Sequence, residues 1–242
     1  MVSRSQMSPE AGSDALLIVT ADDYGYRAPY DEGILEAARA GAVDAVSVMV
    51  GRRRCEPGPL VETGVEIGLH LELPGVSAGE GGARAGGRER ERARRDLLSQ
   101  LEHFQEVLGG PPAHLDGHHH CHAAPGLAAM VARIASERGL PVRSVSPSHR
   151  RLLRCLGIPT PDRLIGRLHA SEPALPRLLE RAERLPAGVT EWMVHPGHRD
   201  PESGSSYDAA REQDLKLILR LSERLRPFRT THAAALGGRP GR

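Results

Sequence analysis

The chain has 242 residues, enough to bury one large core, and its formal net charge at pH 7 is only +1. This balance argues against a general binder of nucleic acid or of membrane surfaces, because such proteins carry a clear excess of basic side chains. Aromatic residues make up 3% of the chain, which also argues against a stacking platform for bases or long sugar chains.

The first third of the chain predicts three strands. The run "ALLIVT" is continuously apolar, which is typical of a strand buried on both faces. After it, Asp31 can cap a helix that ends at Gly41. Residues 43–50 predict a second strand. Residues 65–73 alternate between apolar and polar side chains and place His70 on the polar face of a third strand.

The middle of the chain predicts two helices and two strands. The Gly-rich, charged stretch 75–95 predicts a mobile loop that runs into a helix with a stripe of apolar residues at Leu97, Leu101, Phe104 and Leu108. A short strand, "AHL", ends at Asp116, and Pro125 is expected to open the next helix. The segment "LPVRSV" predicts a further strand.

The last third is less regular. Residues 147–176 contain many prolines and show no clear pattern, whereas "GVTEWMVHPG" predicts a strand that ends at His195. Residues 208–225 show the apolar spacing of an amphipathic helix. The segment "RTTHAAAL" is interpreted as the last strand.

This order of elements predicts one α/β domain. Strands that alternate with helices form parallel sheets with right-handed crossovers. About seven candidate strands favour a distorted, TIM-like (β/α) barrel over a small open sheet. We expect the domain to span residues 14–236, with tails at 1–13 and 237–242. The sequence has no GxGxxG after a strand and no P-loop motif, which argues against a Rossmann cofactor site and a P-loop.

The cysteines and the apolar segments indicate the cellular compartment. Three scattered cysteines do not form a disulfide framework. The first apolar run, residues 15–19, is too short for a signal peptide, and no segment approaches the length of a membrane span. We therefore expect a cytoplasmic protein with no nucleic-acid or membrane partner.

Polar residues follow several of the predicted strands. These are the pair Asp22 and Asp23, then His70, then Asp116 with the histidine cluster 118–122, and finally His195. In a parallel barrel the carboxyl ends of all strands lie on one rim. We therefore expect these residues to meet in one cleft.

Their chemistry suggests a hydrolase. One aspartate and two histidines are a suitable open metal site, because three protein ligands leave positions for water and substrate. A second carboxylate beside the site can take a proton from water, and a histidine across the site can protonate a leaving group. This set predicts metal-assisted hydrolysis of an amide or an ester.

Each motif also has a plainer interpretation. Adjacent acids after a strand often only cap a turn, and a single histidine on a polar strand face is often structural. The cluster from His118 to His122 is also compatible with a mobile His-rich loop. The Arg/Glu run 88–95 is best interpreted as a solvated helix face, and Cys121 as a packing residue. Only the combination of motifs on one rim favours an active site.

The same motifs are similar to those of a known family. The segments "LLIVTADDYGY", "DEGILEAARAG", "IGLHLEL", "PAHLDGHHHCHAAP", "LPVRS" and "TEWMVHPGH" resemble the YdjC-like carbohydrate deacetylases, which include the chitooligosaccharide deacetylases. They occur in the order of the family and cover most of residues 15–225.

The resemblance implies a distorted (β/α) barrel that removes acetyl groups from N-acetylated amino sugars with a divalent metal ion, magnesium or zinc. It places the metal ligands at Asp23, His70 and His118, and the general base at Asp22. His195 would be the acid or would stabilise the transition state. Further residues matched to positions around the site, as substrate contacts or supports, are His119, His120, His122, Arg143 and Glu191. The family also suggests a homodimer.

The sequence departs from the family pattern at a few positions. Gly117 stands where serine is usual, Cys121 where valine is usual, and Thr20 and Asp31 where asparagine is usual. The stretch 75–95 is shorter than in the family and has no aromatic residue, so the motifs leave the identity of the sugar open. Two alternatives remain: a hydrolase of another amide or ester, and a non-catalytic regulator that binds a metal or a sugar. The intact Asp22–Asp23 pair argues against the regulator, because binding alone does not require a base.

Overall fold

The computed structural model describes residues 14–52, 55–78, 85–166, 185–205 and 207–237. The tail 1–13 and all of the tail 237–242 except Gly237 therefore lie outside the described residues. No helix in the described ranges has the length and apolar character needed to cross a membrane.

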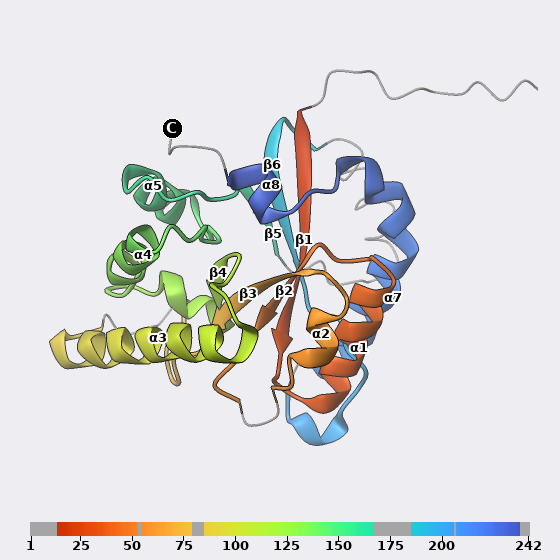
Figure 1. Ribbon diagram of the computed structural model, residues 1–242, viewed down its shortest axis with the longest axis horizontal. Helices are drawn as coiled ribbons and strands as arrows, with labels where there is room; N and C mark the ends of the chain where they lie inside the picture. Colours follow the sequence, from red (N-terminus) through yellow and green to blue (C-terminus); the bar gives the residue numbers. More distant parts are fainter. Residues whose placement is uncertain (1–13, 53–54, 79–84, 167–184, 206, 238–242) are drawn as a thin grey trace, which may run out of the picture.

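A parallel sheet forms the centre of the molecule (Figure 1). Its strands are β1 (Ala15–Tyr24), β2 (Ala45–Val48), β3 (Glu66–Leu71), β4 (Leu115–Gly117), β5 (Arg163–Ile165) and β6 (Gly188–Val194). They are arranged in the order β4-β3-β2-β1-β6-β5, and every pair is parallel. The sheet curls into a half-barrel with β4 and β5 at its edges, so the described strands do not close a barrel.

The expected number of strands, about seven, was too high: the described sheet has six. The backbone of the segment "LPVRSV" pairs with β4 at one isolated bridge, between Leu115 and Val142, and does not form a strand. The segment "RTTHAAAL" is not a strand, because His232–Leu236 forms helix α8. The Thr231 hydroxyl accepts a hydrogen bond from the Ala234 N–H and caps this helix, and alanine has the highest helix propensity.

Helices cover the outside of the curled sheet (Figure 1). The helices of nine or more residues in the described ranges are α1 (Ala28–Arg39), α3 (Gly87–Leu108), α4 (Ala128–Glu137), α5 (Pro147–Cys155) and α7 (Asp208–Leu225), and a short α2 spans Gly58–Val61. Helices α1 and α7 pack together on one side, whereas α3, α4 and α5 follow one another on the other side. The apolar stripes predicted for α3 and α7 face the core.

Some helix ends differ from expectation. Helix α1 starts at Ala28, so Asp31 does not cap it; its carboxylate instead accepts a hydrogen bond from the Gly25 N–H at 2.7 Å. Helix α4 starts three residues after Pro125, at Ala128. Helix α3 already starts at Gly87, so the charged run 88–95 is its solvated first part, apart from the buried Ala93.

Helix α5 was missed in the proline-rich stretch, although its start carries a recognisable signal. The Ser146 hydroxyl accepts a hydrogen bond from the His149 N–H, and Pro147 occupies the first turn. Proline at this position does not break a helix, because its missing N–H has no intrahelical partner there.

Candidate active site

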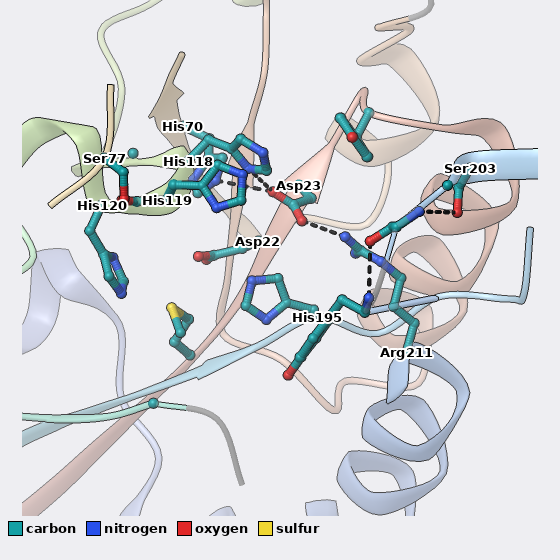
Figure 2. A pocket seen from close by; sticks show the side chains of 17 residues that line it. Asp22, Asp23, His70, Ser77, His118, His119, His120, His195, Ser203 and Arg211 are labelled. Carbon is teal, nitrogen blue, oxygen red and sulfur yellow. Dashed lines mark hydrogen bonds and ion pairs between the residues drawn. The ribbon is translucent and has the colours of Figure 1, made fainter. Parts of the chain in front are cut away.

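The carboxyl ends of the central strands open into one cavity of about 520 Å³ (Figure 2). Seven of the predicted site residues line it: Asp22, Asp23, His70, His118, His119, His120 and His195. The other three, His122, Arg143 and Glu191, are buried and are not among its lining residues. The predicted convergence of Asp22, Asp23, His70, His118 and His195 on one cavity is therefore confirmed, although the sheet is not a closed barrel. Asp116 was expected there too, but it is fully buried next to His70 and is not among the lining residues.

Two consecutive acids reach this cavity because the end of β1 is irregular. In a regular strand, neighbouring side chains point to opposite faces. Here the register with β2 shifts between Ala21 and Tyr24, and Asp23 adopts a φ of 75°. A positive φ is uncommon for a residue other than glycine and is often found at functional sites. The irregularity places Asp22 and Asp23 on one cavity.

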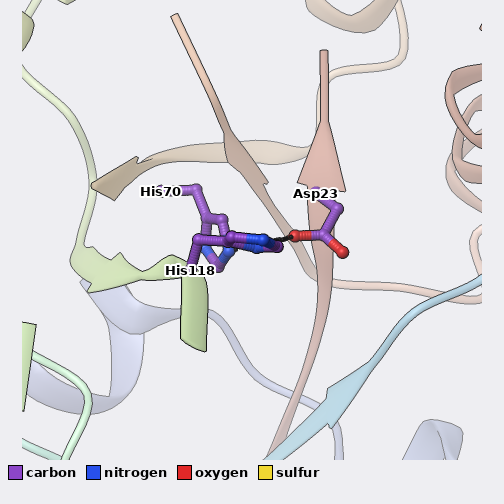
Figure 3. Close-up of side chains that lie close together, drawn as sticks. All are labelled: Asp23, His70 and His118. Atoms are coloured by element: carbon purple, nitrogen blue, oxygen red, sulfur yellow. Dashed lines mark hydrogen bonds and ion pairs between the residues drawn. The ribbon is translucent and has the colours of Figure 1, made fainter. Parts of the chain in front are cut away.

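Asp23, His70 and His118 form a candidate metal centre (Figure 3). The Oδ1 atom of Asp23 lies 2.9 Å from His118 Nδ1 and 3.2 Å from His70 Nε2. The buried Nε2 of His70 has no hydrogen-bond partner among the described residues. One carboxylate oxygen and two ring nitrogens around one point suit several divalent metals, including magnesium and zinc.

A buried carboxylate orients His70 for this purpose. Asp116 Oδ1 lies 2.7 Å from His70 Nδ1, so that nitrogen carries the proton and Nε2 is left to face Asp23. A carboxylate behind a metal-binding histidine commonly orients the ring in this way. Burial lowers the pKa of His70, but Asp116 and Asp22 raise it to about 10, so a proton competes with a cation for this position.

A second group, Asp22, His70 and Asp116, also has ligand atoms close together. Its two carboxylates are both paired with the guanidinium of Arg143, which lies 2.6 Å from Asp22 Oδ2 and 2.7 Å from Asp116 Oδ2. Because a cation already neutralises both, the group with Asp23 and His118 is the better metal site.

Asp22 has the environment of a general base. It is only 1% exposed, and both of its oxygens accept hydrogen bonds from Arg143, at 2.6 and 2.8 Å. Burial raises the pKa of Asp22 to about 6, although Arg143 opposes the shift. A base with a pKa near the working pH is the most effective, so this shift suits proton abstraction.

Arg143 and Glu191 support the base from behind. Arg143 Nε donates to Glu191 Oε1 at 2.9 Å, and the Thr20 hydroxyl donates to the same oxygen at 3.0 Å. Both charged side chains are fully buried. They therefore hold Asp22 in place and are not positioned as cavity-lining substrate contacts.

This buried network continues to α8 through residues that sequence reasoning missed. Ser47 Oγ donates to Asp116 at 2.8 Å and lies 2.9 Å from His114 Nε2, and the His114 ring stacks on His232 at 4.0 Å. Burial lowers the pKa of His232, but the carboxylates of Glu191 and Glu66 raise it to about 9.

A glycine in "GLHL" was a signal for this packing. A Cβ atom on Gly68 would come within 2.2 Å of the His114 ring, so the strand accepts no side chain there. A glycine inside a strand often marks such a close approach.

His195 is half-buried, and its ring packs edge-on against Tyr207 at 4.9 Å between centroids. Its main-chain N–H donates to Asp214 at 2.9 Å, and its Nδ1 has no hydrogen-bond partner among the described residues. Burial lowers the pKa of His195 to about 3. The ring is therefore neutral near pH 7, which favours a hydrogen-bonding role over that of an acid charged in advance.

The remaining histidines differ in position. His120 lines the cavity with a buried Nδ1 that has no hydrogen-bond partner in the described structure, whereas His119 is exposed at its rim. His122 is completely buried and lies 3.1 Å from the Arg143 carbonyl oxygen, so it supports the site and does not line the cavity. Cys121 packs in the core and its Sγ donates to the Leu71 carbonyl oxygen, which confirms its interpretation as a packing residue.

Sequence reasoning also missed Arg211 of α7. Its Nη2 donates to Asp23 Oδ2 at 2.6 Å, and its guanidinium lies 3.9 Å from the centre of the Tyr30 ring. The signal was the spacing Asp208, Arg211, Asp214 on α7, which places three buried charged residues on consecutive turns of one helix face.

Comparison with known proteins identifies the family. The model of the YdjC-like protein family matches residues 16–228. The chain belongs to this family. A carbohydrate deacetylase from Geobacillus stearothermophilus is 31% identical over 226 residues, covering 83% of this chain and 88% of that protein. A chitooligosaccharide deacetylase from Yersinia pestis is 28% identical over 211 residues, covering 77% of this chain and 83% of that protein.

The fold of this YdjC-like protein also has a counterpart among solved structures. A crystal structure from Enterococcus faecalis superposes with a TM-score of 0.74 at 22% identity, covering 93% of this chain and 100% of that one. The resemblance inferred from the motifs is thus confirmed, as is the prediction of an enzyme of the deacetylase family.

Proposed function

We propose that this chain is a metal-dependent hydrolase that removes acetyl groups from N-acetylated amino sugars, either monosaccharides or oligosaccharides, and releases acetate. One observation carries the proposal: a buried carboxylate with a raised pKa, Asp22, shares a cavity with a ready-made Asp–His–His ligand set. The relatives named carbohydrate deacetylase support the choice of substrate.

Asp23, His70 and His118 would hold the cation, which we propose to be magnesium or zinc. When bound, such an ion lowers the pKa of water and polarises a carbonyl oxygen. Arg211 fixes the second oxygen of Asp23, so that its first oxygen stays directed at the two histidines.

Asp22 and His195 would act on the protons of the reaction and on the leaving nitrogen. Asp22 takes a proton from the attacking water, while Arg143 and Glu191 hold its carboxylate in one orientation. His195, neutral and on the neighbouring strand end, forms a hydrogen bond with the leaving nitrogen, and the proton removed from water ends on that nitrogen. The products are acetate and a free amino sugar. His120 would contact the substrate.

Acetate release from N-acetylglucosamine and its oligomers tests the proposal. Metal-stripped protein would be assayed alone and after addition of magnesium, zinc, manganese or cobalt, with Asp22→Asn as the inactive control. We expect release that depends on metal and is lost in the control. Equal release by the stripped protein would contradict the metal dependence, and tight metal binding without any release would direct the search to other acyl substrates.

Several related expectations stay proposals. We propose one catalytic domain over residues 14–236 of the distorted-barrel type, a cytoplasmic location and a homodimer, with no nucleic-acid or membrane partner. A non-catalytic regulator is disfavoured, because the Arg143 support of Asp22 has no use in binding alone. A different amide or ester remains the alternative substrate, and residues 79–84 of the shortened stretch lie outside the described residues.

A further inference from the structure

One apolar side chain, Met193, lines the candidate site on the strand that leads to His195. Alternate residues of β6 point to opposite faces of the sheet. Trp192 and Val194 belong to the hydrophobic core, whereas Met193 and His195 line the cavity. In the parallel register Met193 pairs with Thr20 of β1, two residues before Asp22. Met193 therefore lies along the wall that carries both Asp22 and His195.

The rest of the described lining offers no comparable apolar surface. Apart from glycines and the rings of Tyr26 and Tyr207, the other described lining residues carry carboxylate, imidazole, hydroxyl or guanidinium groups. Met193 is the only aliphatic side chain among them, and it is 7% exposed.

The chemistry of the proposed reaction places a methyl group near this side chain. The carbonyl carbon must lie within reach of the water activated by Asp22, and the nitrogen must lie near His195. The methyl group of an acetyl substituent is one bond away from that carbon. A methyl group that displaces water from a polar side chain leaves that side chain without a hydrogen bond, which is unfavourable. A methyl group that packs against the thioether of methionine has no such cost.

We propose that Met193 determines the length of the acyl group: its side chain ends the acyl site, so that acetyl fits and longer acyl groups do not. The inference rests on the proposed deacetylase function. It assigns Met193 a role in specificity and none in proton transfer.

Competition between acyl groups tests the inference. The variants Met193→Ala and Met193→Leu would be assayed with N-acetyl-, N-propionyl- and N-butyryl-glucosamine, or with the corresponding oligomers if the wild type prefers them. One methylene in an apolar pocket changes kcat/KM by about 10- to 200-fold. We expect Met193→Ala to raise the propionyl-to-acetyl ratio of kcat/KM by about tenfold, near the lower limit because methionine is adaptable. Met193→Leu is similar in volume and should keep the preference for acetyl.

Val194→Ala is the matched control, because Val194 lies next in the same strand, is 2% exposed and belongs to the core on the opposite face. It should keep the wild-type ratio even if it lowers stability. If Met193→Ala does not fold, Met193→Val replaces it, with the same expected direction. Inhibition by acetate, propionate and butyrate gives a measurement independent of turnover, and only Met193→Ala or Met193→Val should favour the longer carboxylates.

The outcomes separate the two proposals. A wild type that hydrolyses no acylated sugar would overturn the proposed function and the inference with it. A wild type that releases acetate, together with a folded Met193→Ala or Met193→Val variant that keeps both the wild-type acyl ratio and the wild-type order of carboxylate inhibition, would overturn the inference alone. A shift that appears equally in Val194→Ala would also overturn it, because the effect would then come from general loosening of β6.

Discussion

The two sides of Asp22 differ in their partners: one is a network of buried charge pairs around Arg143, and the other lines the cavity. Behind it, Arg143 uses its nitrogens on three buried carboxylates, and this network runs on to Ser47 and α8. In front of it, ring nitrogens of His70, His120 and His195 have no hydrogen-bond partner within the described part of the chain. A folded chain seldom leaves buried polar atoms unpaired, so unpaired atoms of residues that line a cavity indicate where ligands bind. Among the described residues, His114, His122 and Glu191 also have an unpaired buried atom each, but they are not among the residues that line the cavity. The side with Arg143 is therefore a support, and the cavity side is the working surface.

The largest effect is expected at the boundary between the two sides. Asp22→Asn keeps the shape of the side chain but removes the base, so turnover should fall by about 10²- to 10⁴-fold. Metal affinity should stay close to that of the wild type, because Asp22 is not in the favoured ligand set. Steady-state kinetics and calorimetric metal titration measure the two quantities. Lost metal binding in this variant would show that Asp22 is a ligand.

The working surface should control metal affinity directly. His70→Ala removes a proposed ligand, so the metal dissociation constant should rise by more than the roughly 10- to 100-fold typical of a supporting residue. His103→Ala is the control, because His103 is an exposed histidine on α3. Calorimetric titration of the stripped proteins measures the change. Equal affinities of the His70 variant and the wild type would remove His70 from the ligand set.

The supporting side should act on the metal more weakly. Asp116→Asn keeps an oxygen near His70 Nδ1 but loses the carboxylate charge, so metal affinity should fall by about 10- to 100-fold. The same titration as for His70→Ala provides the comparison. A larger loss for Asp116→Asn than for His70→Ala would reverse the assignment and favour the metal group that contains Asp22 and Asp116.

The smallest effect concerns the far end of the network. Burial raises the pKa of Glu66, but His232 and the N–H groups of His232 and Ala233 lower it to about 2, while the pKa of His232 is raised to about 9. Because the pKa of Glu66 is lower in the folded chain than its ordinary value of 4.5, the charge of Glu66 stabilises the fold fully above pH 4.5, and this stabilisation is lost as the pH falls toward 2. The pKa of His232 is raised instead, so the stabilisation from its charge is complete below pH 6.5 and is lost as the pH rises through about 9.

Glu66→Gln should therefore lower Tm most between about pH 4.5 and 6.5, with a smaller difference from the wild type at pH 2–3 and above pH 9. Thermal unfolding of both proteins across this pH range measures the difference. A Tm difference that is constant with pH would mean that the charge of Glu66 does not contribute. Glu62→Gln is the control, because Glu62 is an exposed glutamate close to β3 in the sequence.

Local patterns in the sequence were sufficient for most elements and for the position of the cavity that forms the candidate active site. Periodicity identified β1, β2, β3 and β6 and the stripes of α3 and α7, because burial on one face requires a regular repeat of apolar residues. Polar residues at the ends of parallel strands were sufficient to predict the cavity. The same patterns did not separate the short segment at α8 from a strand, because a few apolar residues fit both periods.

The residues that only the folded chain reveals are those whose roles depend on distant partners. Arg211 contacts Asp23 from 188 positions along the chain, and the stack of His114 on His232 joins a loop before β4 to α8. No local spacing encodes such contacts. The curvature of the sheet and the irregular end of β1 decide them, because they determine which buried charges meet. The chain order therefore specified which groups reach the rim, and tertiary packing specified which of them are paired, which are free and how strongly each holds its proton.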